Sequence, residues 1–418
     1  MRILDRKTLA DFIKNRMGDS EIVAPVEVEG RLYFQQLDPE KELAELVWPA
    51  AGPPRGEGVP AAGSEGSDSP NASPASDPLT VNSAKEFFFP RRQELYEQTP
   101  EGIIPRPAVA EKQTLLVFAR PCDARGLAIL DRVFLGEVKD ESYLRARQST
   151  TVIGLHCLQP DRHCFCTSLG GGPFETGGMD LALTPLEGER FLVQGVTEKG
   201  EAVLALLGGK EAGEAERKSL LELRKAAEAA IRRTIEVPDP KIMAERFDSP
   251  YWGEVSRSCL TCGICSYLCP TCHCFDIVDE GYLRLRCWDT CSSDTFTRMA
   301  AGEDHRKHKR SRYRQRIYHK FSYFKENFDI HSCVGCGRCT RHCPVKIDIV
   351  EIVNGIGDAA AIGDPAGSAV AAAGSCSSRS MPRAKASGSG GARTAVRESS
   401  AWVWVGKSVA RIGLPASM

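Results

Sequence analysis

The sequence of 418 residues contains no apolar run of about twenty residues, the length that an α-helix needs to cross a bilayer. Its first residues carry charges where a secretory signal peptide has an apolar centre. Acidic and basic residues nearly balance at a formal net charge of -1, so the chain as a whole has no electrostatic preference for nucleic acid or anionic lipid. These absences predict a cytoplasmic protein without a membrane partner.

Recognisable catalytic signatures are also missing from the sequence. It has no P-loop, no marked Ser-His-Asp arrangement and no complete dinucleotide-binding motif. The glycine-rich segment 168–178 (SLGGGPFETGG) lacks the flanking strand and helix of such a motif. We expect a structural loop there, with a site for flavin or phosphate as the alternative.

Cysteine, by contrast, is abundant, with 17 residues. Cytosolic thiols are kept reduced, so this number indicates metal or redox chemistry rather than disulfides. Eight of the cysteines form two copies of one pattern, CLTCGICSYLCP at 259–270 and CVGCGRCTRHCP at 333–344. In each copy, gaps of two, two and three residues separate the cysteines, and a proline follows the fourth.

This spacing is typical of iron–sulfur proteins, because four thiolates are needed around a compact cluster. In two-cluster ferredoxins the fourth cysteine of each run binds the other cluster. We therefore expect one [4Fe-4S] cluster on Cys259, Cys262, Cys265 and Cys343, and a second on Cys333, Cys336, Cys339 and Cys269. Zinc is the alternative, but a zinc site needs only four ligands and does not explain two quadruplets that both end in Cys-Pro.

A further group of cysteines follows two expected strands. The group consists of Cys122, Cys157, Cys164 and Cys166. If the strands at 114–119 and 150–157 are neighbours, these sulfurs converge at one edge of the sheet and a third cluster follows. The alternative is that they fill a core, since cysteine is often buried. The spacing matches no standard ferredoxin pattern, so both interpretations stay open.

The order of apolar runs predicts an α/β N-terminal domain followed by an α-helical ferredoxin domain with two [4Fe-4S] clusters. A helix at about 5–17 and a hairpin around Glu29-Gly30 open the chain, and 180–197 form another hairpin. We divide the chain into an N-terminal helix and hairpin (1–48), a disordered insertion (49–82), an α/β domain (83–214), a linking helix (215–249), a dicluster domain (250–354) and a low-complexity tail (355–418).

The sequence resembles the iron–sulfur β subunits of cytosolic nickel–iron hydrogenases, or sulfhydrogenases, and the corresponding iron–sulfur component of anaerobic sulfite reductase. The similarity covers about 84–352 and, more weakly, 1–45. It is carried by CLTCGICSYLCPTCHCFDIVDE, CWDTC, RYRQRIYHKFSYFKEN and CVGCGRCTRHCPVKIDI, and by SAKEFFFPRRQELYEQ and ARPCDARGLAILDRVFL upstream. This resemblance implies two [4Fe-4S] clusters that pass electrons between a diaphorase-type partner and a catalytic partner.

We therefore expect an electron-transfer subunit, not catalytic alone, between a flavin/NAD(P)H or ferredoxin partner and the catalytic subunit of a hydrogenase or sulfite reductase-type complex. One alternative is a self-sufficient reductase that contains flavin. A less favoured one is nucleic-acid binding by the basic run 305–320, where Tyr313 and Tyr318 are available for stacking on bases. The same run is also compatible with a cationic neighbour of an anionic cluster, or with a solvated helix face.

Overall fold

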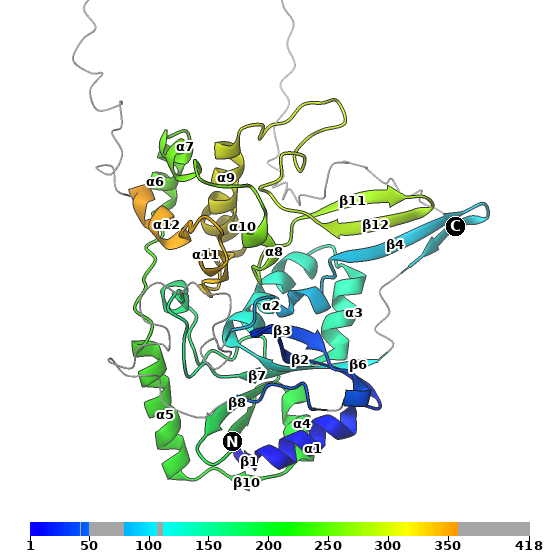
Figure 1. Ribbon diagram of the computed structural model, residues 1–418, viewed down its shortest axis with the longest axis vertical. Coiled ribbons are helices and arrows are strands. Elements are labelled where there is room, and N and C mark those ends of the chain that lie inside the picture. The colour runs from blue at the N-terminus through cyan, green and yellow to red at the C-terminus, as the bar shows by residue number, and fades with distance from the viewer. Residues whose placement is uncertain (42, 50–78, 107–111, 358–418) are drawn as a thin grey trace, which may run out of the picture.

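The computed structural model describes residues 1–41, 43–49, 79–106 and 112–357. It contains an eight-stranded sheet with helices on both faces, a four-stranded sheet, and a group of short helices at one end of the molecule (Figure 1). Most of the expected insertion and nearly all of the expected tail, with Cys376, lie outside the described residues.

The eight-stranded sheet is parallel at its centre and antiparallel toward its edges. Strand pairs β2·β6, β6·β7 and β7·β8 are parallel, whereas the other pairs are antiparallel. In spatial order the strands are β10 (Lys210–Glu211), β1 (Arg2–Asp5), β9 (Arg190–Gly195), β8 (Leu181–Leu186), β7 (Thr150–Leu155), β6 (Gln113–Ala119), β2 (Ser20–Val28) and β3 (Arg31–Gln36). The expected α/β architecture is present in this mixed form.

Local sequence explains the two hairpins of this sheet. Residues Glu29 and Gly30 join β2 to β3 with φ angles of 50° and 74°, the left-handed backbone of a tight hairpin turn. Glu189, with φ 54°, follows Gly188, with φ 72°, in the turn between β8 and β9. Both turns lie where the sequence predicted them.

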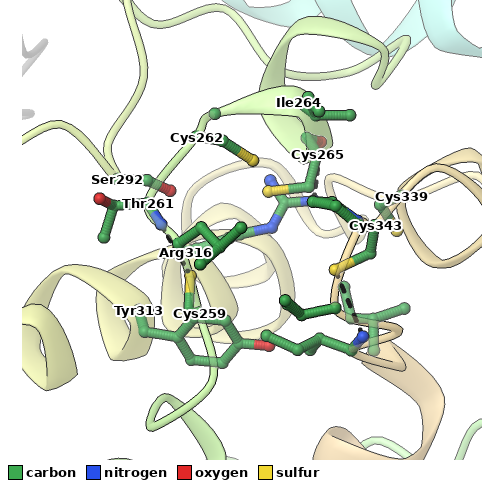
Figure 2. Close-up of a pocket in the computed structure, with 16 residues that line it drawn as sticks. Cys259, Thr261, Cys262, Ile264, Cys265, Ser292, Tyr313, Arg316, Cys339 and Cys343 are labelled. Carbon is green, nitrogen blue, oxygen red and sulfur yellow. Dashed lines mark hydrogen bonds between the residues drawn. The ribbon is translucent and has the colours of Figure 1, made fainter.

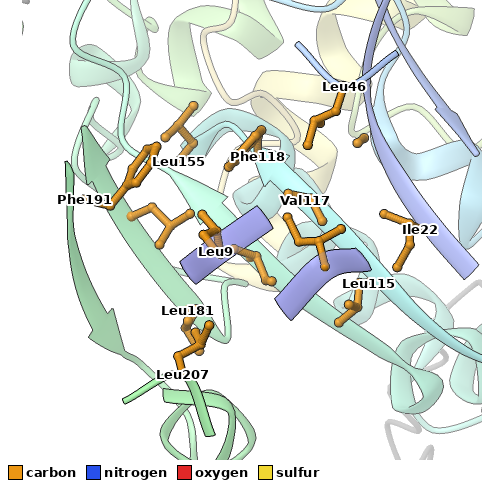
Figure 3. Close-up of a cluster of buried hydrophobic side chains, with 14 of the residues drawn as sticks. Leu9, Ile22, Leu46, Leu115, Val117, Phe118, Leu155, Leu181, Phe191 and Leu207 are labelled. Atoms are coloured by element: carbon orange, nitrogen blue, oxygen red, sulfur yellow. The ribbon is translucent and has the colours of Figure 1, made fainter. Parts of the chain in front are cut away.

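Two pairs of helices cover the two faces of the sheet. On one face lie α1 (Arg6–Arg16) and α4 (Glu198–Leu207), whose leucines pack against the strands, as Figure 3 shows for Leu207 beside Leu181. On the other face lie α2 (Pro121–Phe134) and α3 (Glu141–Ser149). Because both faces are covered, β6 and β7 continue as apolar runs after their first two residues, Gln113-Thr114 and Thr150-Thr151.

The cysteine-rich part consists mainly of short helices. These are α6 (Pro240–Glu245), α7 (Tyr251–Val255), α8 (Ile264–Tyr267), α9 (Lys309–Tyr318), α10 (Phe324–Phe328), α11 (Arg338–Arg341) and α12 (Ile349–Gly357), with a π-helical turn, His319–Tyr323, between α9 and α10. Their shared core includes Trp252, Ile317 and Val353. It also takes up Phe165 from the α/β domain, so the two parts of the chain are packed together.

The four-stranded sheet was not expected for a mainly helical cluster domain. Strands β11 (Phe275–Glu280) and β12 (Leu283–Trp288) form a hairpin inside the cysteine-rich part. β12 pairs with β4 (Arg92–Thr99), which pairs in turn with β5 (Gly102–Pro105). Two regions far apart in sequence therefore complete one sheet (Figure 1).

Three of the expected boundaries shift. Residues 79–82, assigned to the insertion, are buried. The side chain of Asn82 accepts a hydrogen bond from the Phe34 N–H and donates one to the Phe34 carbonyl. Helix α5 (Glu214–Ala229) ends well before 249, and its Leu220 and Leu223 pack on the α/β domain. Helix α12 extends to Gly357, into the expected tail. Within the described ranges, no helix has the length and apolar character needed to cross a bilayer.

Candidate metal centre

The first expected set of cysteines surrounds one pocket. Figure 2 shows the sulfurs of Cys259, Cys262, Cys265 and Cys343 turned toward a common space, while that of Cys339 turns away from it. Three of these cysteines come from the loop before and within α8, and Cys343 follows α11. The structure thus brings the fourth cysteine of the second motif to the first three of the first motif.

The backbone around this set is shaped to bend tightly. Thr261 and Gly263 have φ angles of 55° and 75°, and a Cβ on Gly263 would lie 2.8 Å from the side chains of both Thr290 and Tyr267. The Thr261 N–H donates a hydrogen bond to Cys259 Sγ at 3.4 Å. Glycine is therefore required by both backbone conformation and space at position 263.

The second expected set also lies together, deeper in the molecule. Cys269, Cys333 and Cys336 are buried and Cys339 is partly buried, whereas Cys262 of the first set is exposed. The pKa of Cys333 is raised to about 11 and that of Cys339 to about 12, mainly by burial and in part by the negative charge of the nearby Cys269. Burial also raises the pKa of Cys336, and the negative charge of Cys269 raises it as well. The fourth cysteine of the first motif is thus next to the first three of the second.

Buried cationic side chains lie beside cysteines of both sets. Arg312, Arg316 and Lys320 are four residues apart and all buried, so one face of the basic run is directed into the protein. Arg316 Nη2 donates to the Cys265 carbonyl at 2.9 Å and Nη1 contacts Cys272 Sγ at 3.4 Å. Lys320 Nζ lies 3.3 Å from Cys269 Sγ. A solvated helix face does not describe this side of the run.

These contacts shift the pKa values of Lys320 and Cys269. Burial disfavours the charged form of Lys320, but the thiolates of Cys269 and Cys272 raise its pKa above the ordinary value. A hydrogen bond from Cys272 lowers the pKa of Cys269 well below that of a free thiol, with Lys320 acting in the same direction. Burying cations is costly unless negative charge accompanies them. The donor set and its cations therefore fit an anionic cluster held by thiolates.

A further buried cation, Lys85, was not singled out by the sequence. Its Nζ donates to the carbonyls of Cys272 at 2.9 Å and Ser266 at 3.1 Å, and lies 4.2 Å from the centre of the Trp288 ring. Burial lowers its pKa to about 8. The only hint in the sequence was its place in SAKEFFFPRRQELYEQ, a segment of the family resemblance.

The aromatic residues of the basic run are not available for stacking on bases. Tyr313 and Tyr318 are 8% and 2% exposed, and Tyr318 donates a hydrogen bond to the Met243 carbonyl. Both rings belong to the core of the short helices. Their position removes the feature that suggested nucleic-acid binding.

Seven of the remaining cysteines fall into two groups. Cys122, Cys157, Cys164 and Cys166 line one pocket of their own. In the other group, Cys272 lies beside Cys269 of the second set, Cys291 lies near Cys265 of the first set, and the Cys274 and Cys291 thiols share a hydrogen bond. Among the described residues, no three His, Cys, Asp or Glu side chains are arranged around a single metal ion. The glycine-rich loop is a structural one, since Arg125 donates to its Leu169 carbonyl at 2.8 Å and pairs with Glu175 at 2.9 Å.

Comparison with known proteins agrees with this geometry. Residues 258–347 match the 4Fe-4S dicluster domain family. The chain is also 29% identical over 283 residues to sulfhydrogenase 2 subunit beta of Pyrococcus furiosus, an alignment that covers 66% of this chain and 83% of the relative. The chain resembles an iron–sulfur hydrogenase β subunit. The family resemblance expected from the sequence is thereby confirmed, and 4Fe-4S binding is assigned to the matched segment.

Proposed function

We propose that this chain is a cytoplasmic electron-transfer subunit with two [4Fe-4S] clusters. It connects a flavin/NAD(P)H or ferredoxin partner with the catalytic subunit of a hydrogenase or sulfite reductase-type complex. The observation that supports this most is the exchange of cysteines, because each set of four takes three sulfurs from one motif and one from the other. The similarity to a sulfhydrogenase β subunit supports the kind of complex.

In this proposal the eight thiolates hold the clusters and the surrounding residues set their environment. A bound [4Fe-4S] cluster supplies one-electron chemistry, at a potential set by burial and by hydrogen bonds to sulfur. The backbone N–H groups of Thr261 and Ile347 donate to Cys259 Sγ and Cys343 Sγ at 3.4 and 3.3 Å. Lys320 places positive charge beside Cys269. The hydrogen bonds to sulfur and the positive charge of Lys320 both favour reduction of a cluster, because the reduced cluster carries one more negative charge.

The two sets have different access to solvent, and this gives the relay a direction. Cys262 of the first set is exposed and Leu260 next to it is 60% exposed, whereas Cys269, Cys333 and Cys336 are buried. An exposed apolar side chain beside a redox site is suited to contact with a partner. We therefore assign the partner-facing end of the relay to the first set and the interior end to the second.

The experiment is anaerobic isolation of the native complex, followed by analysis of this chain's iron and acid-labile sulfide. The domain around the two motifs contributes about eight iron atoms and eight sulfides if it holds two clusters. Cys262→Ser or Cys336→Ser removes about four iron atoms and stops electron flow through the complex. Cys376→Ser, outside both motifs, is the control and leaves flow unchanged. Normal turnover of a complex that carries Cys336→Ser would refute the proposal.

A further inference from the structure

The α/β domain contains a second site rich in thiols. Cys122, Cys157, Cys164 and Cys166 all line one pocket, together with Asp161, Arg120 and the backbone of Gly335. We propose that these four cysteines hold a further iron–sulfur cluster. This site is additional to the two clusters of the proposed function and uses none of their ligands.

The fold explains why four cysteines from three segments meet. Strands β6 and β7 are parallel neighbours, with Val117 opposite Ile153, so their carboxyl ends lie at the same edge of the sheet. Cys122 is in the first turn of α2, directly after β6, and Cys157 follows β7. The loop from β7 to β8 then returns Cys164 and Cys166 to this edge. In parallel sheets, this edge is where ligands are bound.

The loop that carries Cys164 and Cys166 is held in place by hydrogen bonds and an ion pair. Asp161 Oδ1 accepts hydrogen bonds from the backbone N–H and the Nδ1 of His163, both at 2.8 Å, and its Oδ2 pairs with Arg341 at 2.5 Å. The Cys157 N–H donates to the Pro173 carbonyl at 2.9 Å. A rigid loop of this kind holds ligands in place at little entropic cost.

The surroundings of the four thiols differ from an ordinary apolar core. All four are only partly buried by exposed area and face a pocket, while Asp161 and Arg120 also line it. Thiolate sets are the ligands that iron–sulfur clusters use. The core-filling alternative leaves the shared pocket unexplained.

The site lies directly against the second set of the dicluster domain. The Phe165 N–H donates to the Gly335 carbonyl at 2.8 Å, and Cys164 Sγ lies 3.9 Å from the Cys336 carbonyl oxygen. A Cβ on Gly335 would be 2.5 Å from the Cys166 nitrogen. Only glycine permits this approach, so the two cysteine-bearing loops are in backbone contact. A cluster on the four thiols therefore extends the relay from the second set into the α/β domain.

A buried ion pair connects the two sites. Arg338, which follows Cys336 by two residues, is fully buried and donates to Asp123 Oδ2 at 2.8 Å and to the Thr80 carbonyl at 2.9 Å. Asp123 follows Cys122 in the sequence, and after burial its carboxylate is the largest cause that raises the pKa of Cys122, with Arg338 acting in the opposite direction. Among the described residues, Arg338 Nη1 has no hydrogen-bond partner. The ion pair therefore joins the helix that carries Cys122 to the segment that carries Cys336.

The test counts iron, sulfide and zinc in the full-length chain purified anaerobically, with EPR of the reduced protein. We expect about twelve iron atoms in the unchanged chain, and about eight after the double substitution Cys157→Ser/Cys164→Ser. The signals that depend on Cys262 and Cys336 persist in this variant. Cys287→Ser is the matched control, because the charged neighbours of Cys287 are Glu280, Arg92 and Asp276 rather than any thiol set.

The outcomes separate this inference from the proposed function. About eight iron atoms in both the unchanged chain and the double variant would overturn the further cluster alone, as would zinc in place of the additional iron. A chain without any iron would overturn the proposed function as well. The count in the unchanged chain decides the question even if the double variant does not fold.

Discussion

At the scale of single residues, the position of buried charge distinguishes this molecule. Lys320, Arg316 and Lys85 are all within the cysteine-rich interior, and each contacts a cysteine sulfur or carbonyl. Buried cations are costly unless they are compensated, and in the proposed function two sets of cluster-bound thiolates provide the compensation. Under that proposal these side chains adjust the charge balance of the clusters rather than the solubility of the chain.

Replacing Lys320 tests this role. Lys320→Met removes a positive charge 3.3 Å from Cys269 Sγ, so added negative charge on the second cluster becomes less favourable. We expect its midpoint potential to fall by on the order of 60 mV, a tenfold change for a one-electron couple. Anaerobic redox titration followed by EPR measures the shift.

The control for this substitution is Lys307→Met, which removes the same charge from an exposed side chain two residues before α9. Solvent screens that charge, so we expect the midpoint potential to change by only a small fraction of the shift expected for Lys320→Met. An equal fall in both variants, or a rise for Lys320→Met, would contradict the role given to Lys320.

The buried ion pair of Arg338 and Asp123 leads to a stability prediction. Both side chains are 0% exposed, so Arg338→Met leaves an uncompensated buried carboxylate. We expect the free energy of unfolding to fall by about 3–5 kcal/mol. Arg284→Met, which breaks an exposed pair with Asp279, costs at most about 1 kcal/mol. Anaerobic urea unfolding compares the two variants, and equal losses would show that burial of the pair does not matter.

At the scale of elements, contact between the two cysteine-bearing loops depends on glycine. Gly335 has a φ angle of 67°, and a Cβ there would meet the Cys166 nitrogen at 2.5 Å. Gly281, in the turn between β11 and β12, has a φ angle of 61°, but a Cβ at that position would meet no atom within 4 Å. The two glycines share a backbone conformation and differ only in their surroundings.

Alanine at these two positions separates strain from collision. Both substitutions cost about 1–2 kcal/mol of stability for the left-handed backbone. Gly335→Ala costs about 1–3 kcal/mol more, because the loop 163–166 must move. Thermal or urea unfolding of the two variants gives the difference, and indistinguishable losses would mean that the loops are not in close contact.

The elements also show what the sequence could predict. Continuous apolar runs predicted β6 and β7, and turn residues predicted the hairpins β2–β3 and β8–β9, because these signals are local. The pairing of β12 with β4 joins residues such as Leu285 and Glu94, far apart in sequence. No local pattern contains that information, so the four-stranded sheet was missed.

The site was predictable to a similar extent. Motif spacing and a ligation rule predicted that the eight cysteines form two sets, and this assignment, like the number of clusters, remains a proposal. The structure places Cys343 in the pocket that Cys259, Cys262 and Cys265 line. The basic run was visible in the sequence, but the burial of Arg316 and Lys320 was not, because helix periodicity in a fully charged segment does not show which face is covered. Lys85 had no signal apart from the family resemblance.

At the scale of the whole molecule, the thiol-rich sites form a series from surface to interior. The first set is near solvent at the exposed Cys262, the second set is buried, and the pocket of Cys122 and Cys166 lies against the second set from the α/β domain. The shared core and the shared four-stranded sheet hold the two parts of the chain together. Such an arrangement keeps the distances between sites constant, as an electron relay requires.

The most direct test of the account is EPR of the reduced, full-length chain, compared between Cys269→Ser, Cys336→Ser and Cys262→Ser. If the motifs exchange their fourth cysteines, Cys269→Ser loses the same cluster signal as Cys336→Ser, although Cys269 belongs to the motif of Cys262. The signal that depends on Cys262 then persists. Loss of the Cys262-dependent signal in Cys269→Ser, or no cluster signal in the unchanged chain, would contradict the account.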